Sequence, residues 1–530
     1  APPAAAPVVA APVAPIESTP AVAAAPVDPM QPVASEVLTL VARPDALTSS
    51  KKDQEALSAF YGARQGMPVF VAQDGFNVRG KAVLARLAAA GEDGLDPEDY
   101  ATPTLAGGAD AQALARAEMQ LAAAALTYAR QAQSGRFTPS RISSLVTPTR
   151  EIPDPKTVLE TLADASDANA MLQGFNPPHA GYKALRGKLA AMTAAEQAAP
   201  KVVSIPEGPL LRPGKSDPRV PILRTRLGLP DAGMDETYDP ELVDAVKDFQ
   251  RSAGLNSEGI VGPATVAALN KDGRHEVTTR ADVIANMERW RWLPRNLGAQ
   301  HVMVNIPEYM ARVFDDGKVI FETRIVAGKP QTPTPLLSHD MEYVVVNPAW
   351  NIPPSIARNE MMPLLRNNPS ALSRRGIEVT RTRGGGYSFR QVPGANNALG
   401  RVKFMFPNDH SVYLHDTPSR SLFANSRRAF SHGCMRLQDP LMFGEVIFGI
   451  GLPDSGITKT RLGKMLGTSE RYINLKNHIP VHVVYFTTFV NEKGELESRE
   501  DIYGINAQVK SLLGLDGRRR IADGTSSRKR

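Results

Sequence analysis

Apolar residues recur every three to four positions over much of the first two hundred residues, the period of an amphipathic helix. Residues 53–71, 78–100 and 110–135 each show this pattern, and the last of these stretches is very rich in alanine. Nothing in them carries obvious chemistry. The pattern predicts a helical domain over 36–204, in which the apolar stripes form the core.

Residues 205–272 show the pattern of three short helices. The middle helix has a strong start signal, because Asp239 is a good N-cap and Pro240 occupies the first helical position. Gly254 marks its end, and 257–270 is expected to be a turn followed by the third helix. The stretch is therefore predicted to be a small three-helix bundle.

A connecting helix is expected within 273–299, and it ends before Pro294. Trp290 and Trp292 lie near its end. Because tryptophan buries a large apolar surface, we expect the helix to pack one of the two into a domain junction.

The period changes to two near residue 300, which is typical of strands with one buried face. An Asp-Asp-Gly sequence at 315–317 marks a hairpin turn. We predict a β-rich domain over 300–505 with an insertion at about 354–400, either a functional lid or a disordered loop. The parts together predict a multidomain α+β protein. Further strands are expected in 342–353, 401–407, 411–417 and 480–497.

The two ends of the chain differ in composition from the rest. Residues 1–35 are expected to be a disordered tether, since the first 32 positions hold 11 Ala and 9 Pro. Such a tether suits an exported protein of the bacterial periplasm or cell envelope, with its signal segment absent from this chain; it is equally consistent with an uninformative linker. Residues 506–530 are expected to be a basic tail.

Charge and hydropathy exclude some classes of function. The net charge of +6 favours anionic partners, but no basic helix with base-reading side chains, RNP-like strand or zinc-finger spacing is present, so nucleic acid is not expected. No apolar run approaches the roughly 20 residues of a membrane span. The longest, 441–452, is predicted to be a buried helix or strand.

The single cysteine of the chain, Cys434, lies in unusual company. Ser431, His432 and Gly433 precede it, and Arg436 follows, whereas a buried structural cysteine normally lies in an apolar run. A thiol attacks as the thiolate, so it needs a base or a positive field. One cysteine with histidines nearby is the pattern of a nucleophile, and zinc is not expected, because no cysteine pair supports it.

Two histidines are candidates for the general base. His415, at the end of a predicted strand, is better placed to face the thiol than His432, two positions before it. The amides of Gly433 and Cys434 are candidates for an oxyanion hole. Arg436 could lower the pKa of the thiol or bind a substrate carboxylate.

Weaker candidates for substrate binding surround this group. Tyr413 shares a strand face with His415, but a core aromatic residue is as reasonable. Trp350 and Asn351 lie at a strand end before the insertion; they could bind substrate or simply form a structural junction. Ser431 is the last candidate for substrate binding. The insertion has an apolar face that could close over a peptide or pack onto its own domain. That face consists of Met361, Met362, Leu364 and Leu365.

Two parts of the chain resemble known families. The three-helix stretch resembles the peptidoglycan-binding domain family. His-Asp-Thr at 415–417 and Ser-His-Gly-Cys-Met-Arg at 431–436 resemble the catalytic signature of L,D-transpeptidases with a YkuD-type domain, although the gap between them is slightly shorter than usual. Large members of that family share the helical scaffold domain, the intercalated peptidoglycan-binding domain and the lid. The positions that match the first family are Val246, Phe249, Gln250, Gly254, Leu255, Gly259, Gly262, Thr265 and Leu269.

The resemblance implies a reaction on peptidoglycan. Cys434 would attack the third residue of a tetrapeptide stem, D-Ala would leave, and an amine would take the acyl group to form a 3-3 cross-link. His415 matches the family's general base, His432 a site-shaping histidine, Gly433 the oxyanion region and Arg436 the terminal cation. The family's thiols are typically acylated by carbapenem-type β-lactams, and no cofactor is implied.

Two alternatives remain open from the sequence. The same acyl-enzyme can serve an L,D-carboxypeptidase, a D-amino-acid exchanger or an enzyme that attaches an envelope protein to peptidoglycan. A non-catalytic wall-binding protein with a vestigial cysteine is the other alternative, and the presence of both His415 and Cys434 argues against it.

Overall fold

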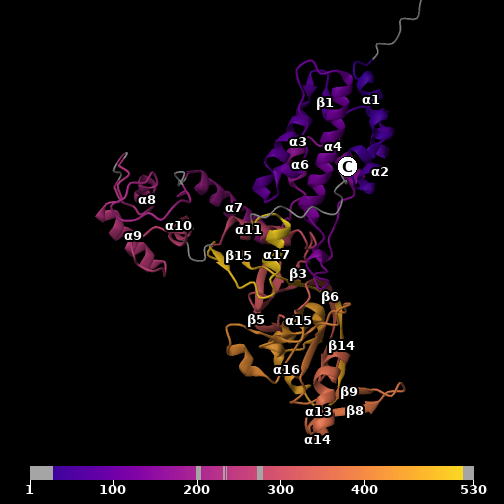
Figure 1. The fold of residues 1–530 in the computed structure, drawn as a ribbon. Helices are drawn as coiled ribbons and strands as arrows, with labels where there is room; N and C mark the ends of the chain where they lie inside the picture. The colour runs from indigo at the N-terminus through magenta and orange to yellow at the C-terminus, as the bar shows by residue number, and fades with distance from the viewer. Residues whose placement is uncertain (1–27, 199–203, 231–232, 234, 271–277, 517–530) are drawn as a thin grey trace, which may run out of the picture.

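The computed structural model describes residues 28–198, 204–230, 233, 235–270 and 278–516. Most of the expected tether and the end of the expected tail lie outside these residues. Figure 1 shows three parts: a helical part, a small helical unit that projects to one side, and a β-rich part. The multidomain α+β architecture predicted from the sequence is thus confirmed.

The helical part packs around α4, whose side chains are buried along most of its length. Glu118 of this helix is fully buried, and its carboxylate accepts hydrogen bonds from the Val69, Phe70 and Val71 amides at 2.6, 2.8 and 3.1 Å. The Tyr61 hydroxyl donates to it at 2.6 Å. These four donors compensate the loss of hydration of the carboxylate. The elements are α1 (Gln31–Val41), α2 (Lys51–Ala63), β1 (Val71–Ala72), β2 (Gly75–Phe76), α3 (Val78–Ala88), α4 (Ala111–Ser134), α5 (Pro155–Asp164), α6 (Ala168–Gln173) and α7 (Ala180–Ala198).

The projecting unit consists of α8 (Val220–Arg226), α9 (Pro240–Ser252) and α10 (Pro263–Asn270). The Asp239 side chain accepts a hydrogen bond from the Leu242 amide at 2.8 Å, so the predicted N-cap is confirmed. The three helices share one small core.

Helix α11 (Arg280–Trp290) and the turn after it join the helical part to the β-rich part. Trp290 and Trp292 are both buried; Trp290 stacks on Phe486 with ring centres 4.4 Å apart, and Trp292 meets Phe137 at 5.8 Å. We expected only one tryptophan at the junction. The structure places both there, because they lie on different sides of the chain at the end of the helix.

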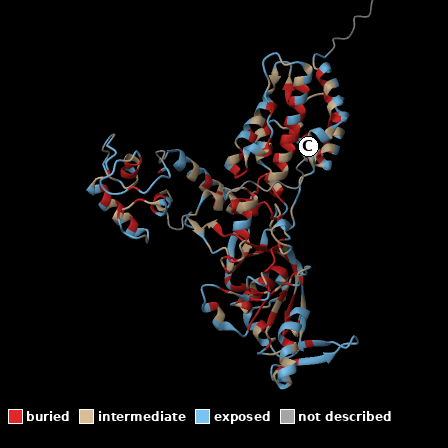
Figure 2. Ribbon diagram, in the orientation of Figure 1, coloured by how far each residue is buried: buried red, intermediate tan, exposed pale blue. Residues whose placement is uncertain are grey.

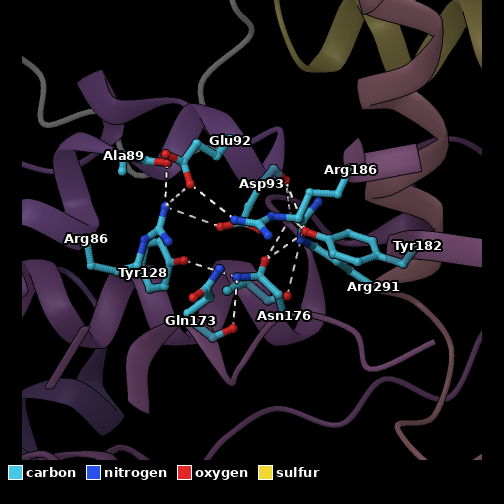
Figure 3. Close-up of polar contacts among 11 residues, drawn as sticks. Arg86, Ala89, Glu92, Asp93, Tyr128, Gln173, Asn176, Tyr182, Arg186 and Arg291 are labelled. Carbon is cyan, nitrogen blue, oxygen red and sulfur yellow. Dashed lines mark hydrogen bonds and ion pairs between the residues drawn. The ribbon is translucent and has the colours of Figure 1, made fainter. Parts of the chain in front are cut away.

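Arg291, between the two tryptophans, is buried at the same junction (Figure 3). Its Nη2 donates to the Asp93 carbonyl at 2.6 Å, to Asn176 Oδ1 at 3.1 Å and to the Tyr182 hydroxyl at 2.9 Å. Its Nε donates to the Ala132 carbonyl at 3.2 Å. One guanidinium therefore satisfies polar groups from four separate segments of the helical part.

We expect Arg291→Ala to lower the free energy of unfolding by about 3 kcal/mol or more, because it removes four buried hydrogen bonds of a charged donor at once. Denaturation in urea followed by tryptophan fluorescence measures this, since two of the three tryptophans flank Arg291. Arg116→Ala, on the exposed side of α4, is the control and should change stability by no more than about 0.5 kcal/mol. Equal effects of the two substitutions would contradict the role assigned to Arg291.

The β-rich part is built on a nine-stranded sheet of order β12-β5-β13-β11-β10-β6-β14-β3-β4. Strand β4 also pairs with β5, so the sheet closes on itself as a barrel. Closure leaves β12 as an added strand beside the end of β5. The strands are β3 (Gln300–Asn305), β4 (Met310–Asp315), β5 (Lys318–Gly328), β6 (Leu337–Val346), β10 (Val402–Met405), β11 (Leu414–His415), β12 (Ala429–Ser431), β13 (Met435–Leu437) and β14 (Arg471–Val484).

Alternate residues of these strands point into a common apolar core. Helix α15 (Pro440–Gly451) packs against this core, where Phe443 meets Phe404 edge to face at 4.8 Å. The apolar stretch at 441–452 is thus a buried helix, one of the two forms expected for it. The remaining elements are α16 (Lys459–Lys464), β15 (Thr488–Val490), β16 (Leu496–Ser498) and α17 (Ile505–Leu512).

The ordered part extends further at both ends than the sequence suggested. Helix α1 begins inside the expected tether, and all but the first residue of α17 lies inside the expected basic tail. Val509 and Leu513 are buried in the barrel core, and Lys510 Nζ lies 2.8 Å from Asp282 Oδ1. Apolar burial against the barrel therefore holds this segment in place.

The insertion at 354–400, called the lid below, folds around a small core of its own. The Met361 side chain is buried in that core, and Met362, Leu364 and Leu365 pack against it. This favours the second of the two roles considered for that apolar face. Figure 2 shows the lid as largely exposed at the far end of the β-rich part. Its elements are α12 (Pro354–Ile356), a π-helical turn (Ala357–Met361), α13 (Met362–Asn367), α14 (Pro369–Arg374), β8 (Ile377–Arg381) and β9 (Tyr387–Gln391), with β9 pairing to β7 (Trp350–Asn351).

Among the described helices, none combines the length and the apolar composition needed to cross a bilayer.

Candidate active site

The candidate site lies on the outer face of the barrel, where β10, β11 and β13 are neighbours. Val402, Phe404 and Leu414 point into the core, so the alternate residues of these strands face outward. Lys403 is opposite His415 in the register of β10 and β11, and His415 is opposite Arg436 in that of β11 and β13. One histidine thus lies in a row between two cations.

His415 is only 4% exposed, and its Nδ1 lies 2.5 Å from the Asp416 carbonyl oxygen. A carbonyl only accepts hydrogen bonds, so Nδ1 carries the proton in its bond to Asp416, and Nε2 of the neutral ring carries the lone pair. Burial, followed by the neighbouring Arg436, lowers the pKa of His415 to about 3. The ring is therefore uncharged at neutral pH.

The Asp416 carboxylate supports the backbone around this ring. Its Oδ2 accepts from the Arg401 amide and its Oδ1 from the Thr417 amide, each at 2.7 Å, and Arg420 also pairs with it. The side chain therefore orients the base only indirectly, by fixing the segment whose carbonyl the imidazole binds.

The loop before Cys434 is held by internal hydrogen bonds. Ser431 Oγ donates to the Cys434 carbonyl at 2.5 Å and accepts from the Gly433 amide at 3.1 Å. Thr334 Oγ1 donates to the Gly433 carbonyl at 2.8 Å. Gly433 has a φ of +117°, a conformation that side-chain-bearing residues rarely adopt, so glycine is required by the backbone.

The hydrogen bonds of this loop affect the two amides, of Gly433 and Cys434, that are expected to stabilise the oxyanion. The Gly433 amide is occupied by Ser431, whereas the Cys434 amide donates to no acceptor in the described part of the chain. Ser431 is itself 2% exposed and contacts the loop. The geometry favours the Cys434 amide as the donor, and the role of Gly433 in this function stays a prediction.

Cys434 is partly buried and has polar neighbours on the same face. The Tyr413 hydroxyl forms a hydrogen bond with its thiol, and Lys403 Nζ lies 4.1 Å from the centre of the Tyr413 ring. Burial raises the pKa of the Cys434 thiol, while Tyr413, Lys403 and Arg436 oppose that effect. The thiol therefore rests protonated at neutral pH.

A pocket of about 310 Å³ opens over these groups. His415, Cys434, Tyr413 and Arg436 line it from the barrel side, and Glu360 belongs to the lid side. The pocket is thus the place where the two halves of the predicted motif meet.

His432 lies at the mouth of this pocket and is directed toward the lid. Its Nε2 is 2.8 Å from Glu360 Oε1. This contact fits the site-shaping role expected for His432 better than the role of base.

The two weaker candidates for substrate binding at the strand end, Trp350 and Asn351, differ in their position relative to the pocket. Trp350 lines the pocket and packs against the lid core, whereas Asn351 is exposed and is not among the lining residues. Sequence analysis missed Lys403 and Glu360. Lys403 could have been noticed, because it is the one charged residue in the otherwise apolar stretch 402–406. Nothing near Glu360 in the sequence marks it, because its partner His432 is distant in the chain.

In the described ranges, no group of three or more His, Cys, Asp or Glu side chains is arranged to hold a metal ion.

The resting pair of thiol and imidazole is uncharged, which determines a pH dependence. Above about pH 3 the base is already neutral, so the rate of Cys434 alkylation should follow thiol ionisation alone. We expect the rate with iodoacetamide to keep rising from about pH 6 to about pH 9, because the thiol pKa is raised. The chain has one cysteine, so all alkylation reports on Cys434.

A resting thiolate would give a different dependence of the alkylation rate on pH. A plateau of the alkylation rate below pH 7, together with thiolate absorbance in the ultraviolet, would mean a resting thiolate–imidazolium pair and would contradict this geometry.

Comparison with known protein families agrees with this site. The "L,D-transpeptidase catalytic domain" model matches residues 299–444, the "Scaffold domain" model matches 55–189, and the "Putative peptidoglycan binding domain" model matches 225–269. The first of these includes both halves of the pocket motif.

Individual proteins show partial similarity. A "Putative L,D-transpeptidase" of Haemophilus influenzae is 29% identical over 225 residues, which cover 39% of this chain and 45% of that protein. The chain therefore spans less than half the length of this curated relative. The N-acetylmuramoyl-L-alanine amidase CwlL of Bacillus licheniformis is 43% identical over 67 residues, 12% of this chain and 19% of the amidase.

Solved structures are more distant. An L,D-transpeptidase fragment from Xylanimonas cellulosilytica is 17% identical, with a TM-score of 0.15, over 52% of this chain and 99% of the fragment. One from Mycobacterium smegmatis is 18% identical, with a TM-score of 0.18, over 35% of this chain and 58% of that one. Such low scores carry no functional information. In chain order, the three matches are to a scaffold domain, a peptidoglycan-binding domain and an L,D-transpeptidase catalytic domain.

Proposed function

We propose that this protein is a cysteine L,D-transpeptidase that uses a peptidoglycan tetrapeptide stem as acyl donor and an amine of a second stem as acceptor. One observation carries the proposal: the only thiol of the chain shares a pocket with a histidine whose Nδ1 is fixed on a carbonyl, which leaves the lone pair on Nε2.

Acylation needs a nucleophile and a base. The Cys434 sulfur attacks the carbonyl carbon of the third stem residue, and the thiol proton moves to His415 Nε2. The Cys434 amide donates to the oxygen that becomes negative. The bond to D-Ala then breaks, the leaving nitrogen takes the proton from the imidazolium, and a thioester remains.

Deacylation uses the same groups in reverse. The acceptor amine attacks the thioester carbon and loses a proton to His415, the carbon–sulfur bond breaks, and the sulfur recovers its proton. The product is a 3-3 cross-link. A neutral imidazole suits both steps, because its unprotonated nitrogen has a lone pair for the proton that each attack releases.

The two cations on either side of His415, Lys403 and Arg436, have a separate role. Arg436 lines the pocket and can bind a carboxylate of the donor, whereas Lys403 lies over the Tyr413 ring and acts on the thiol through its charge. Both positive charges favour the thiolate that forms during attack. Burial lowers the pKa of each, which is consistent with their partial desolvation beside the thiol.

The proposed substrate places the protein in the periplasm or cell envelope. The match at 225–269 supports contact with peptidoglycan, and we propose that this unit holds the chain on its substrate. Whether it binds the glycan with measurable affinity can be tested with the isolated sacculus.

Mass spectrometry of products from purified disaccharide-tetrapeptides tests the function. Cross-linked dimers would support transpeptidation, tripeptides alone would mean an L,D-carboxypeptidase, exchanged D-amino acids would mean an exchange enzyme, and conjugates with an added envelope protein would mean attachment. Unchanged tetrapeptide would refute the proposal. A covalent adduct of a carbapenem on Cys434 is a rapid first check.

A further inference from the structure

The lid has a strongly one-sided charge. Residues 354–400 contain seven arginines against two glutamates, with no lysine or aspartate, a net charge of +5, compared with +6 for the whole chain. All seven arginines are exposed. They are Arg358, Arg366, Arg374, Arg375, Arg381, Arg383 and Arg390.

Most of these charges have no acidic partner. Arg390 pairs with Glu378 at 3.1 Å, and the other glutamate, Glu360, contacts His432 outside the lid. Within the described residues, the remaining six arginines form no ion pair. An ordinary solvated surface mixes both signs, so a patch of one sign is a surface that attracts anions.

The hairpin β8–β9 extends this patch away from the lid core. Ile377 and Phe389 are buried at its base, but Val379 and Tyr387, on the same face, are each 37% exposed. Arg381 is opposite Tyr387, and its guanidinium lies 5.8 Å from the ring centre. The tip therefore combines cations with a small apolar surface, and Figure 1 shows it projecting from the β-rich part.

The same lid borders the reaction pocket. Ile356, Asn359 and Glu360 line the pocket opposite Cys434. A substrate that reaches the thiol must therefore pass beside the charged lid, where an anion would be concentrated before it binds.

We propose that the lid binds the free carboxylates of peptidoglycan stem peptides and steers them to the Cys434 pocket. The proposal rests on the proposed function for the identity of the polymer. An anionic membrane surface is the less favoured partner, because the lid exposes only two large apolar side chains, Val379 and Tyr387, and membrane-binding elements present a broad apolar face.

The test compares two variants of the full chain with equal loss of charge. The first replaces Arg366, Arg375, Arg381 and Arg383 with Gln; none of these residues lines the pocket. The control replaces Lys51, Lys81, Arg116 and Lys183 with Gln, all exposed on the helical part. We measure kcat and KM on disaccharide-tetrapeptide at low and high NaCl, and sedimentation with insoluble peptidoglycan in a Cys434→Ala background.

At low salt, the lid variant should lose about tenfold in kcat/KM through KM, with kcat unchanged, and should lose most of the salt dependence of the wild type. It should also bind less peptidoglycan, while the control variant behaves as wild type in both assays. Equal kcat/KM, salt dependence and peptidoglycan binding in the lid variant and the wild type would overturn the proposal.

Two further outcomes of these measurements separate a membrane partner, and a failure of the proposed function, from a failure of the lid proposal. Arginine-dependent sedimentation with phosphatidylglycerol vesicles, with peptidoglycan binding unchanged, would overturn the proposal in favour of a membrane. If the wild type turns over no tetrapeptide, the proposed function fails, and the peptidoglycan sedimentation still decides whether the lid binds stem carboxylates. Alkylation of Cys434 by neutral iodoacetamide should be equal in all forms, which shows that the pocket is intact.

Discussion

Cys434→Ala will abolish acylation by tetrapeptide stems, with product formation reduced by about 10⁶-fold, the scale found when a covalent nucleophile is removed. The chain has no other thiol to take over the attack. The fold should stay intact, because the sulfur is only partly buried and its contacts, to Tyr413 and at 4.0 Å to the Ser411 carbonyl, are not those that hold the loop. Activity is measured as dimer and free D-Ala, and stability by thermal denaturation.

Cys434→Ser is the matched control for this result. It keeps a nucleophilic atom in place, but a serine hydroxyl gives up its proton far less readily than a thiol, so the same neutral imidazole activates it much less. We therefore expect Ser to be nearly as inactive as Ala. Dimer formation by the Ala variant at a rate near the wild type would show that the mechanism is wrong.

His415→Ala should reduce the acylation rate by about 10²–10⁴-fold, the usual contribution of a general base. His432→Ala should change it by only a few fold, because His432 contacts Glu360 of the lid at 2.8 Å rather than completing the base–carbonyl pair. The two variants remove the same side chain from the same pocket and so control for each other. Single-turnover acylation, followed by protein mass, separates this effect from deacylation.

The comparison has a clear contrary outcome. A larger loss for His432→Ala than for His415→Ala would reassign the base, and the hydrogen bond from His415 Nδ1 to the Asp416 carbonyl would then be structural only.

The sequence predicted local elements well and distant pairings poorly. The hairpin of β4 and β5 has a turn signal at 315–317, and Asp239 is visible as a cap. The parallel pairing of Val481 with Val302 joins two barrel strands, β14 and β3, that lie far apart in the chain. Alternation of apolar and polar residues shows which residues of a strand share a face, but it does not show which other strand is its neighbour in the sheet.

The same limit explains what was found and missed at the site. Cys434 and His415 were identifiable because their residue types and motif carry chemistry. Lys403 reaches them only through the pairing of β10 with β11, which has no local signal. The engagement of the Gly433 amide by Ser431 depends on the loop conformation, so it could not be predicted from the residue types alone.

In the proposed mechanism, Cys434 carries the acyl group during catalysis. The intact mass of the wild-type protein, measured shortly after mixing with purified disaccharide-tetrapeptide, tests this most directly. We expect a mass gain equal to the donor minus D-Ala, located by digestion to the peptide that contains Cys434 and absent from Cys434→Ala. Cross-linked dimers formed without any such adduct, or an adduct on another residue, would contradict it.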